Sequence, residues 1–325
     1  MDPGRGGPLA SAVSSAASSL GDPLGLGPRE LSRWAEGLGI PTPGDAPGRP
    51  LLVTGHMYQL APYILGLSAL RESVGEGPLR AAARAASAAP RLLRLSALLV
   101  PRPAAAIYDG YLRNVALLLR AAGVEFSYDP REPYPGALVY ELGRDDDFSS
   151  IARSFVGYLR GTGASRLITV DPHTYDLLTR VYPRYVEEFE GEFEVLHYSE
   201  LLGGLELRRL DLRVAYHEPC HLVVRDREAG ALGELLGRAA EVVRSPRSGR
   251  RNFCCGGPAE LLRGDIAAAV SSRRFEELKS LGADVIVTAC PICHVNLNKD
   301  GSVVDASEVL AAAAGLRQLK RDRRI

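Results

Sequence analysis

Short apolar stretches alternate with longer amphipathic stretches along most of this chain. Strand patterns rich in Val, Ile and Leu occupy residues 51–56, 124–128, 166–170, 212–216 and 284–288. Helical patterns with apolar residues on one face occupy residues 28–38, 79–99, 108–122, 148–160, 175–189, 226–240, 266–281 and 308–314. Because strands that alternate with helices are typical of parallel sheets with helical crossovers, the pattern predicts an α/β fold.

The second half of the chain repeats the first in residues as well as in elements. Residues 164–174 align without gaps on residues 283–293, and residues 134–136 fall where residues 254–256 fall, with a slippage of one position. We therefore predict two pseudo-symmetric Rossmann-like domains with mainly parallel sheets, at residues 51–210 and 211–325. The alternative is that two α/β domains share strand and turn chemistry by chance.

The residues before the first strand pattern have a different composition. Residues 1–21 are rich in Ala, Ser and Gly and lack the continuous apolar core of a secretory signal. We predict a disordered lead-in there, followed at residues 22–50 by an N-terminal helix and a proline-rich linker.

Composition narrows the class of protein. The chain has 325 residues, of which 46% are hydrophobic and 24% charged, and its formal net charge is zero. These values are typical of a globular protein and give no indication of nucleic-acid binding. The longest apolar stretches, such as residues 92–100, are shorter than the roughly 20 residues that span a bilayer. We predict no transmembrane segment, so any membrane association would come through a partner.

All five cysteines lie in the second half: Cys220, Cys254, Cys255, Cys290 and Cys293. An odd number of cysteines that includes a vicinal pair is a poor disulfide framework. It suits a reducing cytoplasm in which thiols serve as ligands. The clustering predicts a cytoplasmic protein with a metal or redox site.

The cysteines follow strand patterns, so the fold would bring them to one edge of a sheet. Tetrahedral zinc takes four ligands and would leave one thiol over, whereas a polynuclear iron–sulfur cluster can use five. Two alternatives stay open at this point. One is a zinc-stabilised scaffold subunit, and the other is a metal-free thiol–disulfide reductase that uses the vicinal pair or the Cys290-x-x-Cys293 motif.

The cysteine spacing, with the preceding His217-Glu218-Pro219-Cys220-His221, resembles the cysteine-rich "CCG" domain found in heterodisulfide reductase. It is also similar to the iron–sulfur subunits of glycolate oxidase, lactate oxidation systems and anaerobic glycerol-3-phosphate dehydrogenase. The resemblance covers residues 22–315. It implies that the five cysteines bind an iron–sulfur cluster, noncubane or another 4Fe-4S type, in an electron-transfer subunit of an oxidoreductase complex.

The same resemblance implies partners. Many relatives carry a ferredoxin-like segment with two Cys-x-x-Cys-x-x-Cys runs, which this chain lacks. Electrons would then arrive from a separate flavoprotein or ferredoxin-like subunit and leave to an acceptor such as a disulfide or a membrane quinone-reducing partner. No dinucleotide fingerprint or P-loop occurs in the chain, so flavin or nicotinamide chemistry would belong to another polypeptide.

The first half holds other residues at the positions where relatives often have cysteines: His56, Tyr134, Pro135, Asp171 and Thr174. A first cluster of the usual sort is therefore not expected. His56, Asp171 and His173 could bind a single zinc or iron ion, or they could be ordinary turn and cap residues left after cysteine loss.

Three further histidines flank the cysteines: His217, His221 and His294. Each could donate a hydrogen bond to sulfur or move a proton, or could be a packed imidazole. The sequence does not indicate which of the three is functional.

Overall fold

The computed structural model describes residues 7–99, 102–223, 230–259 and 262–319. The chain divides into two compact units that each draw on several stretches of sequence. The first unit comprises Met1–Asp109, Phe126–Leu167 and Leu177–Glu194, and the second comprises Gly110–Glu125, Ile168–Asp176 and Val195–Ile325. The predicted domain boundary after residue 210, and the pseudo-symmetry of two halves, stay predictions.

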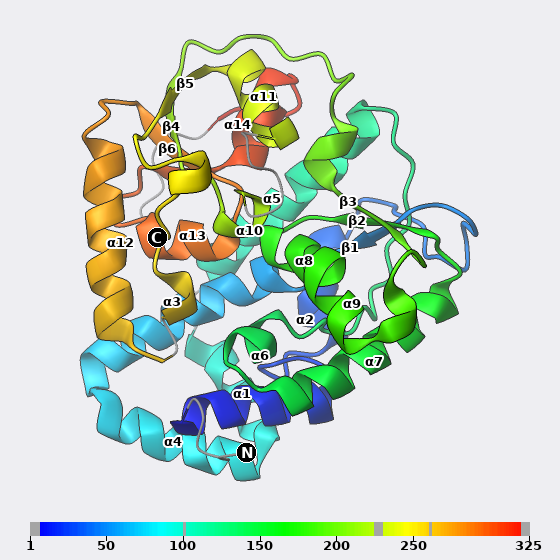
Figure 1. Ribbon diagram of the computed structural model, residues 1–325, viewed down its shortest axis with the longest axis vertical. Helices are drawn as coiled ribbons and strands as arrows, with labels where there is room; N and C mark the ends of the chain where they lie inside the picture. The colour runs from blue at the N-terminus through cyan, green and yellow to red at the C-terminus, as the bar shows by residue number, and fades with distance from the viewer. Residues whose placement is uncertain (1–6, 100–101, 224–229, 260–261, 320–325) are drawn as a thin grey trace. The chain divides into compact units, whose positions relative to one another are not determined.

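The second unit is built on a four-stranded sheet. Its strands are β4 (Arg213–Tyr216), β5 (Glu241–Arg244), β6 (Val285–Thr288) and β7 (Val303–Asp305), in the order β5-β4-β6-β7, and all three neighbouring pairs are parallel (Figure 1). All four residues of β6 are buried, as expected for a central parallel strand with both faces covered. The predicted α/β class with parallel strands is confirmed.

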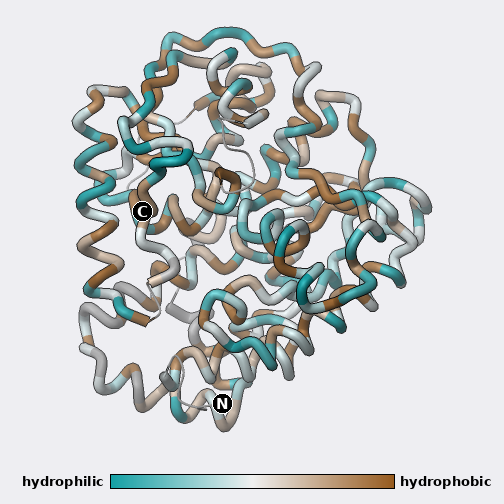
Figure 2. Tube along the Cα trace, viewed as in Figure 1, coloured by the Kyte–Doolittle hydropathy of each residue, from teal (hydrophilic) through white to brown (hydrophobic). Residues whose placement is uncertain are grey.

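The helices of this unit are α10 (Cys220–Val223), α11 (Gly230–Ala239), α12 (Gly264–Lys279), α13 (Pro291–Leu297) and α14 (Ala306–Ala313). Helix α11 packs on α14, and α12 packs on α13. In Figure 2, α12 passes from brown near its start to teal nearer its end, where its charged residues lie.

The chain order of the sheet creates a topological switch point. The connection from β4 leads outward to β5, whereas the connection from β6 leads in the opposite direction to β7. In open α/β sheets, ligands bind beyond the carboxyl ends of the strands at such a point. Residues that follow β4 and β6 are therefore well placed to form a site.

The first unit is mostly helical. Its helices include α1 (Gly7–Leu20), α2 (Pro28–Ser32), α3 (Met57–Val74), α4 (Glu76–Ala88), α6 (Ala137–Glu141) and α7 (Asp145–Thr162). The long helix α5 (Arg102–Ala121) contributes residues to both units. The second sheet of the chain has the order β1-β2-β3, formed by Leu51–Val53, Arg166–Thr169 and Glu194–His197. None of the described helices is long and apolar enough to cross a membrane.

The prediction of a disordered lead-in is wrong for the described part of residues 1–21. Residues Gly7–Leu20 form α1, and Ala10, Val13 and Ala17 on it are buried. These small apolar residues recur at helical spacing and give α1 a face that packs on α4. Residues 1–6 lie outside the described residues.

Two secondary-structure predictions also need correction. The strand predicted at residues 124–128 is reduced to an isolated bridge between Leu51 and Ser127. The helix predicted at residues 175–189 is interrupted: α8 (Pro172–Asp176) leads into a π-helical turn (Leu177–Val181), which α9 (Tyr182–Tyr185) follows. Pro183 within this stretch lacks the amide hydrogen that a continuous helix would use. The helix predicted at 226–240 is described from Gly230 onward.

Candidate metal centre

Three connections of the second unit carry the five cysteines. Cys220 is the first residue of α10, after β4, and Cys290 is the N-cap of α13, after β6. Cys254 and Cys255 lie in the connection from β5 to α12. Because β4 and β6 are adjacent parallel strands, Cys220 and Cys290 come to the same edge of the sheet.

The five sulfurs form one contiguous group. Thiol–thiol hydrogen bonds link Cys220 to Cys254, Cys254 to Cys255, Cys255 to Cys293, and Cys293 to Cys290. All five cysteines are described residues, and each is free of disulfide bonds. Cys255, Cys290 and Cys293 are buried, whereas Cys220 and Cys254 are half-buried. The structure thus brings together every cysteine that the sequence singled out.

Backbone amides point at three of these sulfurs. Gly256 N donates to Cys254 Sγ at 3.3 Å, and Gly257 N donates to Cys255 Sγ at 3.4 Å. At the start of α13, Cys293 N donates to Cys290 Sγ at 3.4 Å. Amide hydrogen bonds of this kind stabilise the thiolate, which is the metal-binding form of cysteine.

The two glycines after the vicinal pair are required by close approach. Gly256 has a φ of +89°, and a Cβ there would lie 2.7 Å from the carbonyl oxygen of Ala267 in α12. A Cβ on Gly257 would lie 2.4 Å from Cγ2 of Ile292 and 3.4 Å from Cys255 Sγ. The cysteine loop can therefore press against α12 and α13 only because both residues lack a side chain.

The thiols differ in proton affinity. Hydrogen bonds from the thiols of Cys220 and Cys255 lower the pKa of Cys254 to about 2. Burial would raise the pKa of Cys290, but hydrogen bonds from Cys293 and His173 hold it well below its ordinary value. The pKa values of Cys220, Cys255 and Cys293 are raised by hydrogen bonds to neighbouring thiols and by burial. A cation among the sulfurs would favour all five thiolates, so metal binding should release protons.

His173 of α8 contacts the cysteine group directly. Its Nε2 atom lies 3.3 Å from Cys290 Sγ, and its ring lies 4.3 Å, centroid to centroid, from the ring of His221. His221 in turn contacts Asp176 through Nδ1, with 2.8 Å between nitrogen and carboxylate oxygen. No sequence motif indicates that His173 and Cys290, 117 positions apart, would meet.

The other flanking histidines have different surroundings. His294 is buried in α13 and its Nε2 lies 3.0 Å from the hydroxyl of Tyr111. His217 follows β4; an imidazole nitrogen of His217 and the sulfurs of Cys255 and Cys293 all lie within 4.8 Å of one another. Burial lowers the pKa of His217 to about 3, and the positive charge of Arg274 acts in the same direction. His217 is thus a neutral imidazole beside the cysteines.

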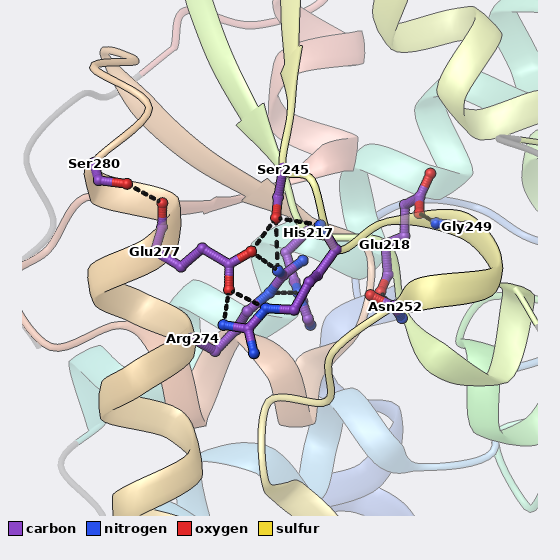
Figure 3. Close-up of polar contacts among 9 residues, drawn as sticks. His217, Glu218, Ser245, Gly249, Asn252, Arg274, Glu277 and Ser280 are labelled. Carbon is purple, nitrogen blue, oxygen red and sulfur yellow. Dashed lines mark hydrogen bonds and ion pairs between the residues drawn. The ribbon is translucent and has the colours of Figure 1, made fainter.

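Glu218 orders the loop that leads to the vicinal pair. Its buried carboxylate accepts hydrogen bonds from Gly249 N and from Arg244 Nη1, the latter at 3.3 Å. Asn252 Nδ2 donates to the Glu218 carbonyl at 2.9 Å (Figure 3). These contacts tie the chain just before Cys220 to the segment just before Cys254.

The first-half candidates have structural roles in their own surroundings. Asp171 caps α8, because its Oδ1 accepts from the backbone nitrogens of His173 and Thr174 at 2.9 and 3.1 Å. In the first unit, His56 has a φ of +62° and stacks on Tyr134, with 6.3 Å between ring centroids. Pro135, also buried, accepts a hydrogen bond from the Tyr182 hydroxyl. Among the described residues, no group of three candidate metal ligands includes His56.

The donor set fits a soft metal centre with more than one metal ion. Five thiol sulfurs in one group exceed the four that tetrahedral zinc uses, and soft sulfur is the preferred donor for iron–sulfur clusters. Amides and imidazoles surround the sulfurs, as expected where anionic sulfur has to be stabilised.

Comparisons with known proteins agree with this chemistry. Residues 214–298 match the family model described as the CCG cysteine-rich domain. Over 222 residues, the chain is 30% identical to a probable membrane-anchored ferredoxin of Chromohalobacter salexigens, covering 62% of this chain and 33% of the relative. It is 27% identical over 219 residues to the probable iron–sulfur-binding oxidoreductase FadF of Bacillus subtilis, covering 62% of this chain and 30% of that relative.

A third relative belongs to the dihydromethanophenazine:CoB–CoM heterodisulfide reductase of Methanosarcina mazei, of which it is one polypeptide. It is 28% identical over 225 residues, which cover 62% of this chain and 54% of that polypeptide. The chain therefore spans about a third to about half of the length of these relatives. The resemblance predicted from the cysteine spacing is confirmed: the chain carries a cysteine-rich domain of the CCG family, with all five of its cysteines inside it.

Proposed function

We propose that this protein is an iron–sulfur electron-transfer subunit of a multi-subunit oxidoreductase. The observation that carries the proposal is the contiguous group of five free thiols, linked from Cys220 through Cys254, Cys255 and Cys293 to Cys290. The CCG domain match and the iron–sulfur and reductase names of the relatives support it.

All five cysteines would hold the cluster, noncubane or another 4Fe-4S type. When bound, such a cluster supplies one-electron redox chemistry that no amino-acid side chain offers. The residues of this chain would set its environment: the amides of Gly256, Gly257 and Cys293 donate to sulfur, and the buried sulfurs are screened from water. Hydrogen bonding and burial are the means by which a protein tunes the reduction potential.

The site is accessible from one side. Cys220 and Cys254 are half-buried whereas the other three cysteines are buried, so an electron partner would approach at these two residues. Arg250 and Arg251 are exposed in the segment that leads to Cys254. We infer that the partner presents a complementary acidic surface there, since opposite charges steer association.

The chemical class of the partners follows from the same proposal. A flavoprotein or ferredoxin-like subunit would deliver electrons, and a disulfide or a membrane quinone-reducing partner would accept them. We expect a cytoplasmic protein, peripheral to the membrane only through such a partner. Within the complex, this chain would serve as an oxidoreductase component.

An experiment on the anaerobically purified chain tests the redox role. After reduction with dithionite, the chain should give a paramagnetic resonance signal that disappears when an electron acceptor is added. A zinc-stabilised scaffold would give no signal in either state. A metal-free thiol reductase would also be silent, and would still reduce a small disulfide after complete removal of metal by a chelator.

A further inference from the structure

Arg274 makes an unusual contact with His217. The Arg274 side chain is fully buried in α12, and its Nε donates to His217 Nδ1 at 3.2 Å (Figure 3). A guanidinium group carries only hydrogen-bond donors, and a neutral imidazole carries one donor and one acceptor nitrogen. Nδ1 must therefore be the acceptor, which leaves the imidazole proton on Nε2.

A network of fixed partners holds the guanidinium in this position. Arg274 Nη1 donates to Ser245 Oγ and to Glu277 Oε1, each at 3.0 Å. Ser245 and Arg247 also donate to the Glu277 carboxylate (Figure 3). Because a buried arginine needs its paired carboxylate, the guanidinium cannot turn away from His217 without losing these contacts.

The opposite side of the imidazole faces the cysteines. His217 Nε2 is buried and has no hydrogen-bond partner among the described residues. An imidazole nitrogen of His217 and the sulfurs of Cys255 and Cys293 lie within 4.8 Å of one another. Since Arg274 occupies Nδ1, the nitrogen with a hydrogen bond left to make is Nε2.

We propose that His217 donates its Nε2 proton to a sulfur of the metal centre and is not itself a metal ligand, with Arg274 as the positioning residue that fixes this tautomer. The inference rests on the proposed iron–sulfur function and identifies one of the residues that tune the site. A hydrogen bond to sulfur withdraws negative charge and favours the reduced form, so this contact raises the reduction potential.

A ligand role for His217 conflicts with the observed contact. Metal binding through Nε2 would need the proton on Nδ1, where it would point at the Nε proton of Arg274. Two donors would then face each other in a buried place, without an acceptor between them. The geometry favours donation over ligation.

Nitrogen-15 NMR of the full chain, labelled in its histidine side chains, tests the tautomer. The metal-free reduced chain is used, because a paramagnetic cluster broadens the signals, and the His217→Leu variant identifies the His217 resonances. We expect a protonated Nε2 and an unprotonated Nδ1. In the Arg274→Met variant, that preference should weaken. A protonated Nδ1 in the unmodified chain would overturn the inference.

The reduction potential of the iron-loaded chain tests the hydrogen bond to sulfur. We expect His217→Leu to bind as much iron and sulfide as the unmodified chain but to have a more negative potential, and His217→Gln, which keeps an N–H donor, to recover part of the shift. His197→Leu is the matched control, because His197 is a buried histidine of the same unit whose Nδ1 contacts Ser199. Its potential should not change.

Pulsed paramagnetic resonance distinguishes donor from ligand. A donor gives a weak nitrogen coupling and an exchangeable proton coupling that disappear in His217→Leu, whereas a ligand gives a strong nitrogen coupling. A strong coupling, an unchanged potential, or loss of iron from His217→Leu would contradict the inference.

The two proposals fail in different ways. Iron and sulfide analysis of the unmodified chain tests the function without reference to His217. The tautomer is read without iron, so it tests the role of Arg274 even if the centre proves to hold zinc.

Discussion

His173 Nε2 lies 3.3 Å from Cys290 Sγ, although the two residues are 117 positions apart in the chain. The contact joins α8 to the N-cap of α13, so the segment at residues 172–176 helps to enclose a site whose cysteines all lie after residue 219. It gives Cys290 a polar partner besides the amide of Cys293.

Replacing His173 should weaken metal retention. His173→Phe keeps an aromatic ring of similar size but removes the contact to Cys290 Sγ. Loss of a residue that supports a metal ligand typically lowers metal affinity about 10–100-fold. The rate of iron loss to a chelator measures the effect. His197→Phe serves as the control, and an equal rate in both variants would argue against a specific role for His173.

Each of the five cysteines should be needed for the centre. Cys255→Ser is the most informative change, because Cys255 links Cys254 to Cys293 in the middle of the thiol group. We expect it to lower iron and sulfide content substantially. A zinc site would tolerate the loss of one of the five thiols, since zinc takes four ligands. Ala311→Ser, which buries a hydroxyl elsewhere in the same unit, controls for destabilisation.

The glycines of the cysteine loop should not tolerate a methyl group. Gly256→Ala combines a φ of +89° with a Cβ 2.7 Å from a backbone oxygen, so we expect a loss of stability of about 1–3 kcal/mol and reduced iron content. Gly237→Ala in α11 is the matched control, because a Cβ there meets nothing within 4 Å. It should be neutral or stabilise by up to about 1 kcal/mol. Denaturant unfolding of the two variants measures the difference.

The buried carboxylate of Glu218 should matter more than an exposed one. Glu218→Ala removes the acceptor for Gly249 N and Arg244, and we expect a loss of about 1–3 kcal/mol together with easier release of iron. Glu241 pairs with Arg213 at the surface, and Glu241→Ala should cost no more than about 1 kcal/mol. Similar losses in the two variants would contradict the role of Glu218 in ordering the loop.

Stability should fall in mild acid because of His56. Burial lowers its pKa to about 3, from an ordinary value of 6.5. The unfolded chain therefore binds this proton first, so the stabilisation is complete above pH 6.5 and declines as the pH falls toward 3. Between pH 7 and pH 5 the contribution should drop by about 2 kcal/mol.

The matched variant is His56→Asn, since asparagine tolerates the left-handed backbone at this position. Its free energy of unfolding should depend less on pH over the same range. If the two pH profiles run parallel, the burial of His56 does not carry a proton-linked stability.

The sequence predicted the centre of the fold better than its edges. The strands at 212–216 and 284–288 were predicted correctly because their short Val- and Ile-rich runs precede cysteine turns. Strands β5 and β7 were not predicted, since Glu241–Arg244 and Val303–Asp305 are too short to show a periodic pattern. Helix α1 was missed because small residues such as Ala and Ser also suit a flexible segment.

The site shows the same division. Cysteine type and position predicted which residues gather, because thiols after parallel strands reach one sheet edge. The partners of these cysteines could not be predicted. His173 and Arg274 reach the site through tertiary packing, and no local motif marks them. The repeat did pair Asp171 with Cys290, but it did not indicate that the neighbouring His173 would contact that cysteine.

The central claim is that five cysteines hold one iron–sulfur cluster, and metal analysis of the anaerobically purified chain tests it most directly. Iron, acid-labile sulfide and zinc are measured on the same sample, together with paramagnetic resonance spectra before and after reduction. The account predicts several iron and sulfide ions per chain and a signal that depends on the redox state. A single zinc ion per chain, with no sulfide and no signal, would contradict it.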